Sequence, residues 1–295
     1  MSDYRSRSAL LQSVERVFPG LVKILRKANA RRIEHQHWAR RIADVIACPD
    51  SARLLRVARA GKVSGGYQVM HNGLEVAVDG YYGNGITRLL ARNRGCHEPQ
   101  EEVVFHAIVR SLLPASIMIE AGAYWGFYSL WFCQAVPRAR VLLIEPVEAH
   151  LQVGRRNFAR NHHTGEFVQA YVGATAGMVA DGIPTLTIDS LAAEKELNSI
   201  AILHADIQGF EMEMLSGSDR LLRLHAIDYV FVSTHSNELH HACAALLRQH
   251  GYCILVSIDL DETYSLDGVL VACSPAMRPP PFEPPSRRPR KSQPH

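Results

Sequence analysis

From about residue 99 to residue 274, short apolar runs alternate with longer stretches in which apolar positions recur at helical spacing. The apolar runs predict strands at 116–122, 140–146, 167–172, 200–207, 227–235, 252–259 and 268–274. The stretches between them predict helices over about 99–113, 126–136, 147–161, 210–224 and 237–250. Because buried strands that alternate with helices form parallel sheets covered on both faces, the pattern predicts an α/β fold with a doubly wound, mainly parallel sheet.

The chain before this region has a different pattern. Residues 8 to about 60 carry apolar side chains at helical spacing, which predicts two or three helices punctuated by Pro19 and Pro49. Asn72 and Gly73 stand between two β-rich runs and predict a hairpin. The resulting divisions are a helical N-terminal extension (1–62), a β-hairpin with a connecting segment (63–96), the α/β domain (97–275), and a Pro- and Arg-rich tail expected to be disordered (276–295).

Composition fits a globular protein, with 47% hydrophobic and 21% charged residues in a chain of 295. No apolar run approaches the ~20 residues needed to cross a bilayer, and the N-terminus lacks a signal-peptide core, so a cytoplasmic location is expected. The six cysteines include no C-x-x-C pair, which argues against a disulfide framework or a thiolate zinc site.

The net charge of +3 is unevenly distributed. Residues 1–62 hold 14 Lys or Arg against 5 Asp or Glu, residues 63–275 hold 13 against 23, and residues 276–295 hold 5 against 1. Two interpretations of the basic ends stay open. In the first, they contact an anionic partner, for example a membrane surface beside the N-terminal helices. In the second, they are solvated and neutralised by the acidic domain.

The stretch IEAGAYWGF follows the first strand of the expected sheet and suggests a ligand site. Gly122 and Gly126 allow a sharp turn and a close approach of the backbone to a ligand. The pattern is not the G-x-G-x-x-G of dinucleotide sites, and Tyr124 leaves less room for a pyrophosphate. Glu120 and Glu145 end neighbouring strands, where a carboxylate can accept both hydroxyls of a ribose. The combination indicates an adenosine-containing cofactor that lacks a bridging pyrophosphate.

These motifs, their order and their spacing resemble the FkbM-type class I methyltransferases, which use S-adenosylmethionine. The resemblance runs from residue 97 through the motifs MIEAGAYWGFYSL, VLLIEP, TLTIDSL, ILHADIQGFEMEMLSG and VFVSTHS, and more weakly to about residue 273. It implies a Rossmann-like sheet of seven strands whose last strand is antiparallel. With the turn described above, it implies cofactor contacts at Glu98, Glu120, Gly122, Ala123, Tyr124, Gly126, Glu145 and Pro146. The family more often has Lys at His204 and Glu at Gln208, so its acceptor cannot be carried over.

Three polar residues are candidates for catalysis. His204 and Asp206 lie two positions apart, on one face of a strand if it is still extended there, and His235 ends the neighbouring strand. They are interpreted as a base with its orienting partner, as ligands of a divalent metal, or as hydrogen-bonded groups without chemistry. The first interpretation is preferred, and metal is not favoured. Tyr81 and Tyr82 are candidates for the lining of an acceptor pocket.

The predicted function is S-adenosylmethionine-dependent O-methylation of a hydroxyl on a sugar, a glycan or a natural-product-like small molecule. No Asn/Asp-Pro-Pro-Tyr motif occurs, which argues against methylation of nucleic-acid amino groups, so no specific nucleic-acid partner is expected. One alternative is a non-catalytic methyltransferase-like fold whose basic termini bind a membrane or an anionic polymer. An NAD-linked dehydrogenase is disfavoured because the third glycine of its fingerprint is missing.

Overall fold

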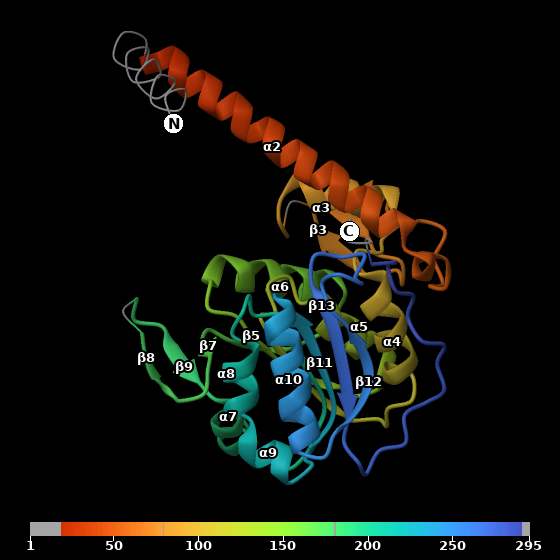
Figure 1. Cartoon of the computed structure of the whole chain (residues 1–295), viewed down its shortest axis with the longest axis vertical. Coiled ribbons are helices and arrows are strands. Elements are labelled where there is room, and N and C mark those ends of the chain that lie inside the picture. Colours follow the sequence, from red (N-terminus) through yellow and green to blue (C-terminus); the bar gives the residue numbers. More distant parts are fainter. Residues whose placement is uncertain (1–18, 79, 180, 291–295) are drawn as a thin grey trace, which may run out of the picture. The chain divides into compact units, whose positions relative to one another are not determined.

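A computed structural model describes residues 19–78, 80–179 and 181–290 (Figure 1). The chain divides into two compact units, one up to Ala43 and one from Asp44 onward. Helix α2 (Pro19–Ala47) is continuous, and a 3₁₀ helix, η1 (Pro49–Ala52), follows it. Helix boundaries at both prolines were predicted, whereas the part of the expected helical region before Pro19 lies outside the described residues. Within the described ranges, no helix is both long enough and apolar enough to cross a membrane.

The predicted hairpin is present. Strands β1 (Val63–Ser64), β2 (Tyr67–Val69) and β3 (Glu75–Ala77) form an antiparallel sheet in that order. The turn between β2 and β3 contains Gly73, whose φ of 92° lies in the left-handed region that glycine adopts without strain. Helix α3 (Asn84–Arg92), which follows the hairpin, was not predicted.

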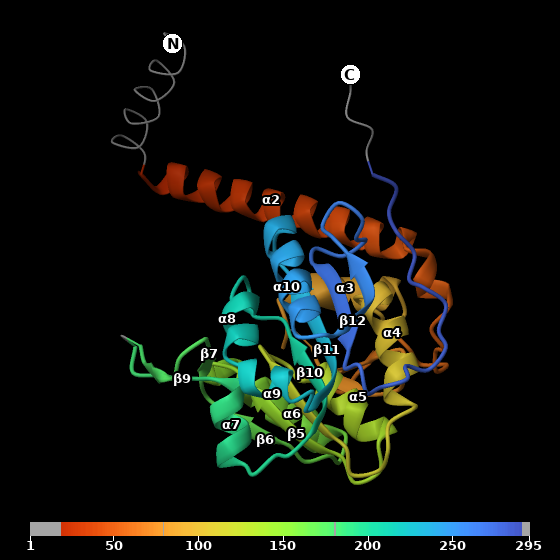
Figure 2. The same ribbon diagram turned by 60° about the horizontal axis from the view of Figure 1, so that its bottom comes forward.

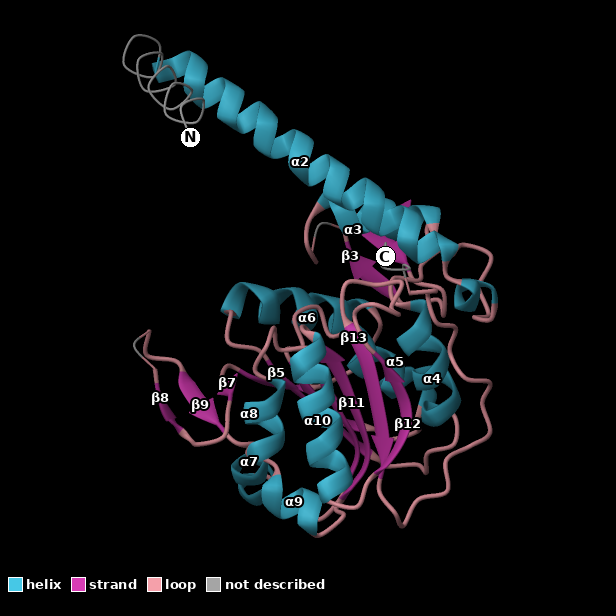
Figure 3. Ribbon diagram, in the orientation of Figure 1, coloured by secondary structure: helices cyan, strands magenta, loops and turns pink. Residues whose placement is uncertain are grey.

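A seven-stranded sheet forms the centre of the second unit (Figures 1 and 3). Its strand order is β12-β13-β11-β10-β4-β5-β6. β13 runs antiparallel to both of its neighbours and the other pairings are parallel, so the expected seven-stranded, doubly wound sheet with an antiparallel last strand is confirmed. The strand bounds are β4 (Ile117–Ala121), β5 (Arg140–Ile144), β6 (Glu166–Val168), β10 (Ile200–Ala205), β11 (Ile227–Thr234), β12 (Cys253–Ile258) and β13 (Gly268–Cys273).

The direction of the chain across the sheet reverses between β4 and β10. From β4 the chain proceeds to β5 and β6 on one side, and it then crosses to β10 and β11 on the other. In open parallel sheets, ligands bind outside the carboxyl ends of the strands at such a reversal. The topology therefore directs attention to the segments that follow β4, β5 and β10.

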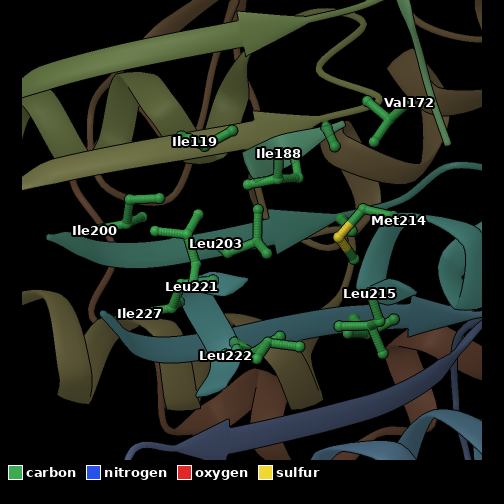
Figure 4. Packing of buried hydrophobic residues seen from close by; sticks show 14 of the residues in the cluster. Ile119, Val172, Ile188, Ile200, Leu203, Met214, Leu215, Leu221, Leu222 and Ile227 are labelled. Carbon is green, nitrogen blue, oxygen red and sulfur yellow. The ribbon is translucent and has the colours of Figure 1, made fainter. Parts of the chain in front are cut away.

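Helices cover both faces of the sheet. The covering helices are α4 (Pro99–Val109), α5 (Phe127–Ala135), α6 (Glu148–Arg160), α7 (Ile188–Glu194), α8 (Glu211–Ser216), α9 (Asp219–Arg223) and α10 (Asn237–Gln249). Figure 4 shows Leu221 and Leu222 of α9 packed beside Ile227 of β11 in a large apolar cluster. The single helix predicted over 210–224 is divided at Gly217, where a Cβ would lie 2.2 Å from the carbonyl oxygen of Gly173.

Two segments differ from the predictions. The run expected as one strand over 167–172 forms the end of β6 and then β7 (Tyr171–Val172), which joins β9 (Pro184–Leu186) and β8 (Gly177–Met178) in a small separate sheet. The tail was expected to be disordered, but its described part, 276–290, is an extended segment that runs alongside α4 (Figure 2).

Specific polar contacts hold this tail. Ser286 donates from its backbone N–H to the fully buried carboxylate of Asp50 at 2.8 Å, and Gln100 donates to the Ser286 carbonyl oxygen at 2.6 Å. Arg290 pairs with Asp259 at 2.8 Å, and Arg287 pairs with Glu262. Composition alone suggested disorder because it does not show these buried partners.

Candidate active site

A cavity of about 1060 Å³ opens at the carboxyl ends of β4, β5 and β10. Gly122 follows β4, Glu145 follows β5, and Asp206 follows β10, and all three line the cavity. Tyr81 and Tyr82, predicted to line an acceptor pocket, also line it. The sheet topology thus brings the predicted glycine turn and two of the predicted acids to one site.

Gly122 allows two segments to meet at the floor of this cavity. Its φ is 74°, and a Cβ at this position would lie 1.9 Å from the carbonyl oxygen of Asp206. The backbone N–H groups of Gly122 and Ala123 both donate to the carbonyl oxygen of Ile144, at 2.9 and 3.0 Å. Gly126, with a φ of 70°, is the N-cap of α5. Ala123 and Gly126 therefore shape the turn without lining the cavity.

Glu145 presents a nearly buried carboxylate to the cavity. It is 6% exposed, and its Oε2 accepts the backbone N–H of Tyr124 at 3.3 Å. Its Oε1 accepts the N–H of Val147 at 3.0 Å and lies 3.2 Å from His150 Nδ1. The ring of Tyr124 stacks on His150 with centroids 3.6 Å apart. Oε2 has only this one partner among the described residues and can accept a second hydrogen bond, so capacity for a ligand hydroxyl remains. Pro146 lines the cavity beside it.

Two predicted cofactor contacts, Glu98 and Glu120, do not line the cavity. Glu120 accepts the backbone N–H of Ser129 at 3.0 Å, and burial raises the pKa of its carboxyl group. Glu98 is the N-cap residue of α4 and accepts the hydroxyl of Tyr128 at 3.0 Å. Both side chains accept hydrogen bonds from residues of α5 in the interior, so they help to position that helix.

His204 does not join the other catalytic candidates, contrary to the prediction. Its Nε2 lies 2.7 Å from Glu101 Oε1, and Ser233 donates to the other Glu101 oxygen at 3.0 Å. Burial alone would lower the pKa of His204, but the adjacent Glu101 carboxylate reverses this effect and raises it. The separation arises because β10 ends at Ala205, so the alternation of a strand does not extend to Asp206.

Asp206 and His235 do come together, as predicted. His235 Nε2 lies 3.3 Å from Asp206 Oδ1 and 3.3 Å from Asp267 Oδ1, and its Nδ1 lies 2.7 Å from Glu211 Oε1. Burial lowers the pKa of His235, but hydrogen bonds to Asp206 and Glu211 and the charge of Asp267 outweigh it and raise the pKa to about 10. At neutral pH this histidine is an imidazolium. It forms an ion pair with Asp206, which also accepts a hydrogen bond from the Gln208 amide at 3.0 Å, and it does not serve as the base.

The metal interpretation named His204, Asp206 and His235 as possible ligands. Among the residues that the structure describes, no group of three or more His, Cys, Asp or Glu is arranged to hold a metal ion. His204 contacts Glu101 instead of facing Asp206, so the three residues named as candidate metal ligands do not converge.

Several residues of the site were not predicted. Glu211 and Asp267 complete the ring of carboxylates around His235, and Tyr171, Met178 and Phe210 line the cavity. Glu211 follows Asp206 within the motif DIQGFE, which is a local signal that could have been used. Phe210 lies in the same motif. Tyr171, Met178 and Asp267 depend on the small β7-β9-β8 sheet and on the loop between β12 and β13, which the sequence pattern does not specify.

Comparison with known proteins gives one match to a family and many distant structural similarities. The model of the methyltransferase FkbM domain matches residues 176–254. No curated protein matches the chain. The precorrin-6y C5,15-methyltransferase of Geobacter metallireducens is 14% identical, with a TM-score of 0.40 over 58% of this chain and 87% of that chain. The fibrillarin of Aeropyrum pernix, solved with S-adenosyl-L-methionine, is 13% identical, with a TM-score of 0.39 over 56% and 72%.

The structural similarities are too weak to inform the site, whereas the family match covers a part of it. The matched segment includes Asp206, Glu211 and His235. The sheet order and the turn at Gly122 agree with what the resemblance to this family implies for the rest of the domain. Residues 176–254 of this chain are thus similar to the methyltransferase FkbM domain, and the seven-stranded sheet with its antiparallel β13 has the arrangement that this resemblance implies.

Proposed function

We propose that the protein transfers the methyl group of S-adenosylmethionine to a hydroxyl group of a small molecule, with sugars, glycans and natural-product-like compounds as the acceptor classes. The observation that carries the hydroxyl preference is the carboxylate of Asp206, which lines the cavity and is paired with a protonated His235. A hydroxyl becomes a better nucleophile when a carboxylate accepts its proton, so this arrangement suits O-methylation.

The cavity residues fit the cofactor. Glu145 offers an acceptor for the ribose hydroxyls, and Gly122 lets the backbone approach without a side chain. Tyr124 and Pro146 add apolar surface beside them. When bound, S-adenosylmethionine supplies an electrophilic methyl group on a positively charged sulfur. The four residues would hold and align it, which is the main contribution of a protein to an in-line displacement.

Asp206 would accept the proton of the acceptor hydroxyl when the hydroxyl oxygen takes the methyl group from the bound donor. The donor would be released as a neutral thioether, so atoms and charges would balance. Asp206, Glu211 and Asp267 surround one imidazolium. Their summed charge stays negative while His235 is protonated, so the group can accept a proton.

The test is Asp206→Asn, which keeps the shape of the side chain and removes its capacity to accept a proton. We expect binding of S-adenosylhomocysteine to persist, while methyl transfer from ¹³C-labelled S-adenosylmethionine to compounds in a metabolite extract falls about 10²–10⁴-fold. Asp219→Asn, a change on α9 that does not line the cavity, serves as the matched control. The carbon shift of the labelled methyl group distinguishes methyl ethers from methyl amines, and a methyl amine product contradicts the proposal.

The alternative function is a binding module that contacts an anionic partner through its basic termini. The structure gives the C-terminal tail less support as such a contact than the N-terminal segment. Arg287, Arg288 and Arg290 pair with carboxylates of the same chain, which reduces the charge available to an external anion. Removal of residues 276–295 should therefore leave liposome binding unchanged. Contact of residues 1–62 with an anionic membrane stays a prediction, and salt-sensitive liposome binding that survives Glu145→Ala would support it.

A further inference from the structure

The volume of the cavity lies at the upper end of the range for small-molecule sites. Small-molecule sites typically measure about 300–1,000 Å³, and this cavity measures about 1060 Å³. Gly122 and Glu145 lie at its floor beside the sheet, whereas β8 and the start of α8 contribute other parts of its wall. The volume leaves space for an acceptor next to the cofactor. The residues of β8 and of the start of α8 that line the cavity determine which acceptors can bind there.

Exposed apolar side chains gather around the cavity. Fourteen large apolar side chains are exposed in the described part of the chain, and six of them line this one cavity. Met178 is 70% exposed and Phe210 is 60% exposed, so neither contributes much to the core. Clustered apolar exposure of this kind marks a binding surface. The six residues, named here the apolar rim, are Tyr82, Val147, Tyr171, Met178, Val179 and Phe210.

The charges in the cavity wall have one sign. The described lining residues include four carboxylates and no Lys or Arg. Asp181 accepts a hydrogen bond from the Tyr171 hydroxyl at 2.9 Å, and this partner is neutral, so the negative charge of Asp181 stays. The carboxylate of Glu213 is exposed and forms no ion pair with any residue that the structure describes. His235 offsets the charge of Asp206, so an anion that enters the cavity meets the unpaired carboxylate of Glu213 with no Lys or Arg among the described lining residues.

We infer that the acceptor is a hydroxyl compound with a large apolar or aromatic body and no negative charge. Its body packs against the apolar rim while its hydroxyl reaches Asp206. Phosphorylated sugars, nucleotides and acidic glycans are disfavoured as acceptors by the negative wall. This inference narrows the acceptor class and rests on the proposed function, because it assumes that the same cavity binds the methyl donor.

The test compares two fluorescent probes of similar aromatic size on the full chain, with S-adenosylhomocysteine present and absent. 1-Aminoanthracene is uncharged, and 8-anilinonaphthalene-1-sulfonate is an anion. We expect the uncharged probe to bind at least about tenfold more tightly, since a unit charge close to an exposed carboxylate is worth about this factor. Equal affinities, or tighter binding of the anion, overturn the inference.

Three variants locate the binding. Glu213→Lys should improve binding of the anionic probe about tenfold and leave the uncharged probe within twofold. Phe210→Ser should weaken the uncharged probe several-fold, whereas Leu224→Ser, at a residue that is 64% exposed and outside the cavity, should have no effect. Unchanged binding in both Glu213→Lys and Phe210→Ser contradicts the inference.

The two proposals fail in different ways. If calorimetry detects no S-adenosylhomocysteine binding, the proposed function fails whatever the probes do. If S-adenosylhomocysteine binds and the anionic probe still equals the uncharged one, only the acceptor class is wrong.

Discussion

Replacing His235 with Gln removes the positive charge that faces Asp206, Glu211 and Asp267. The carboxylate of Glu211 is fully buried, and the His235 side chain is only 18% exposed. Removing one partner of a buried ion pair costs about 3–5 kcal/mol because the remaining charge loses its compensation. We therefore expect His235→Gln to lower the free energy of unfolding by about 3 kcal/mol at pH 6.5, measured by urea denaturation.

The pH dependence of stability provides the sharper measurement. The pKa of His235 is raised from 6.5 to about 10, so its stabilisation is complete below pH 6.5 and is lost as pH rises toward 10. Between these values the folded state holds a proton that the unfolded state has released. Each pH unit then removes about 1.4 kcal/mol, or about 2 kcal/mol from pH 6.5 to pH 8.0.

The double variant His235→Gln/Glu211→Gln isolates this effect. It removes the imidazolium together with the buried carboxylate that would otherwise take up a proton in its place. Its unfolding free energy should fall about 2 kcal/mol less than that of the wild type between pH 6.5 and pH 8.0. His35→Gln, at an exposed histidine of α2, should retain the wild-type slope. If wild type and double variant have the same slope, the assignment of His235 as an imidazolium is refuted.

Two further predictions concern the turn and the tail. Gly122→Ala should destabilise the protein by about 3 kcal/mol or more and abolish S-adenosylhomocysteine binding, because the new Cβ would meet the Asp206 carbonyl oxygen at 1.9 Å. Gly65→Ala, with a positive φ and open space around it, should cost only about 1 kcal/mol in urea denaturation, and an equal loss would refute the steric argument. Removal of residues 281–295 should lower Tm by about 4–8 °C, because Asp50 loses its hydrogen bonds to Ser286. An unchanged Tm in calorimetry would show that these contacts contribute no stability.

The sheet and the floor of the site could be predicted because they depend on local patterns. Apolar runs specified the strands, and polar residues directly after them had to meet at one edge. Gly122, Glu145 and Asp206 accordingly line the same cavity. The hairpin followed equally from the local pair Asn72 and Gly73.

The remaining parts depend on contacts between distant segments. His204 was placed beside Asp206 because strand alternation was extended one residue too far, and its partner Glu101 lies about a hundred positions earlier in the chain. Asp267 reaches His235 from the loop between β12 and β13, for which no local signal exists. Ser286 lies in a sequence typical of disorder, yet it binds a buried carboxylate of the body. Sequence periodicity contains no information about such pairs.

The central claim is that the cavity beside Glu145 binds S-adenosylmethionine. Isothermal calorimetry with S-adenosylhomocysteine tests it most directly, using wild type, Glu145→Ala and, as a matched control, Glu148→Ala on the exposed side of α6. We expect one binding site in wild type and in the control. We expect at least about 100-fold weaker binding in Glu145→Ala, because hydrogen bonds to a charged group contribute about 1.5–3 kcal/mol each. No heat of binding with folded wild-type protein, or equal affinity in Glu145→Ala, would contradict it.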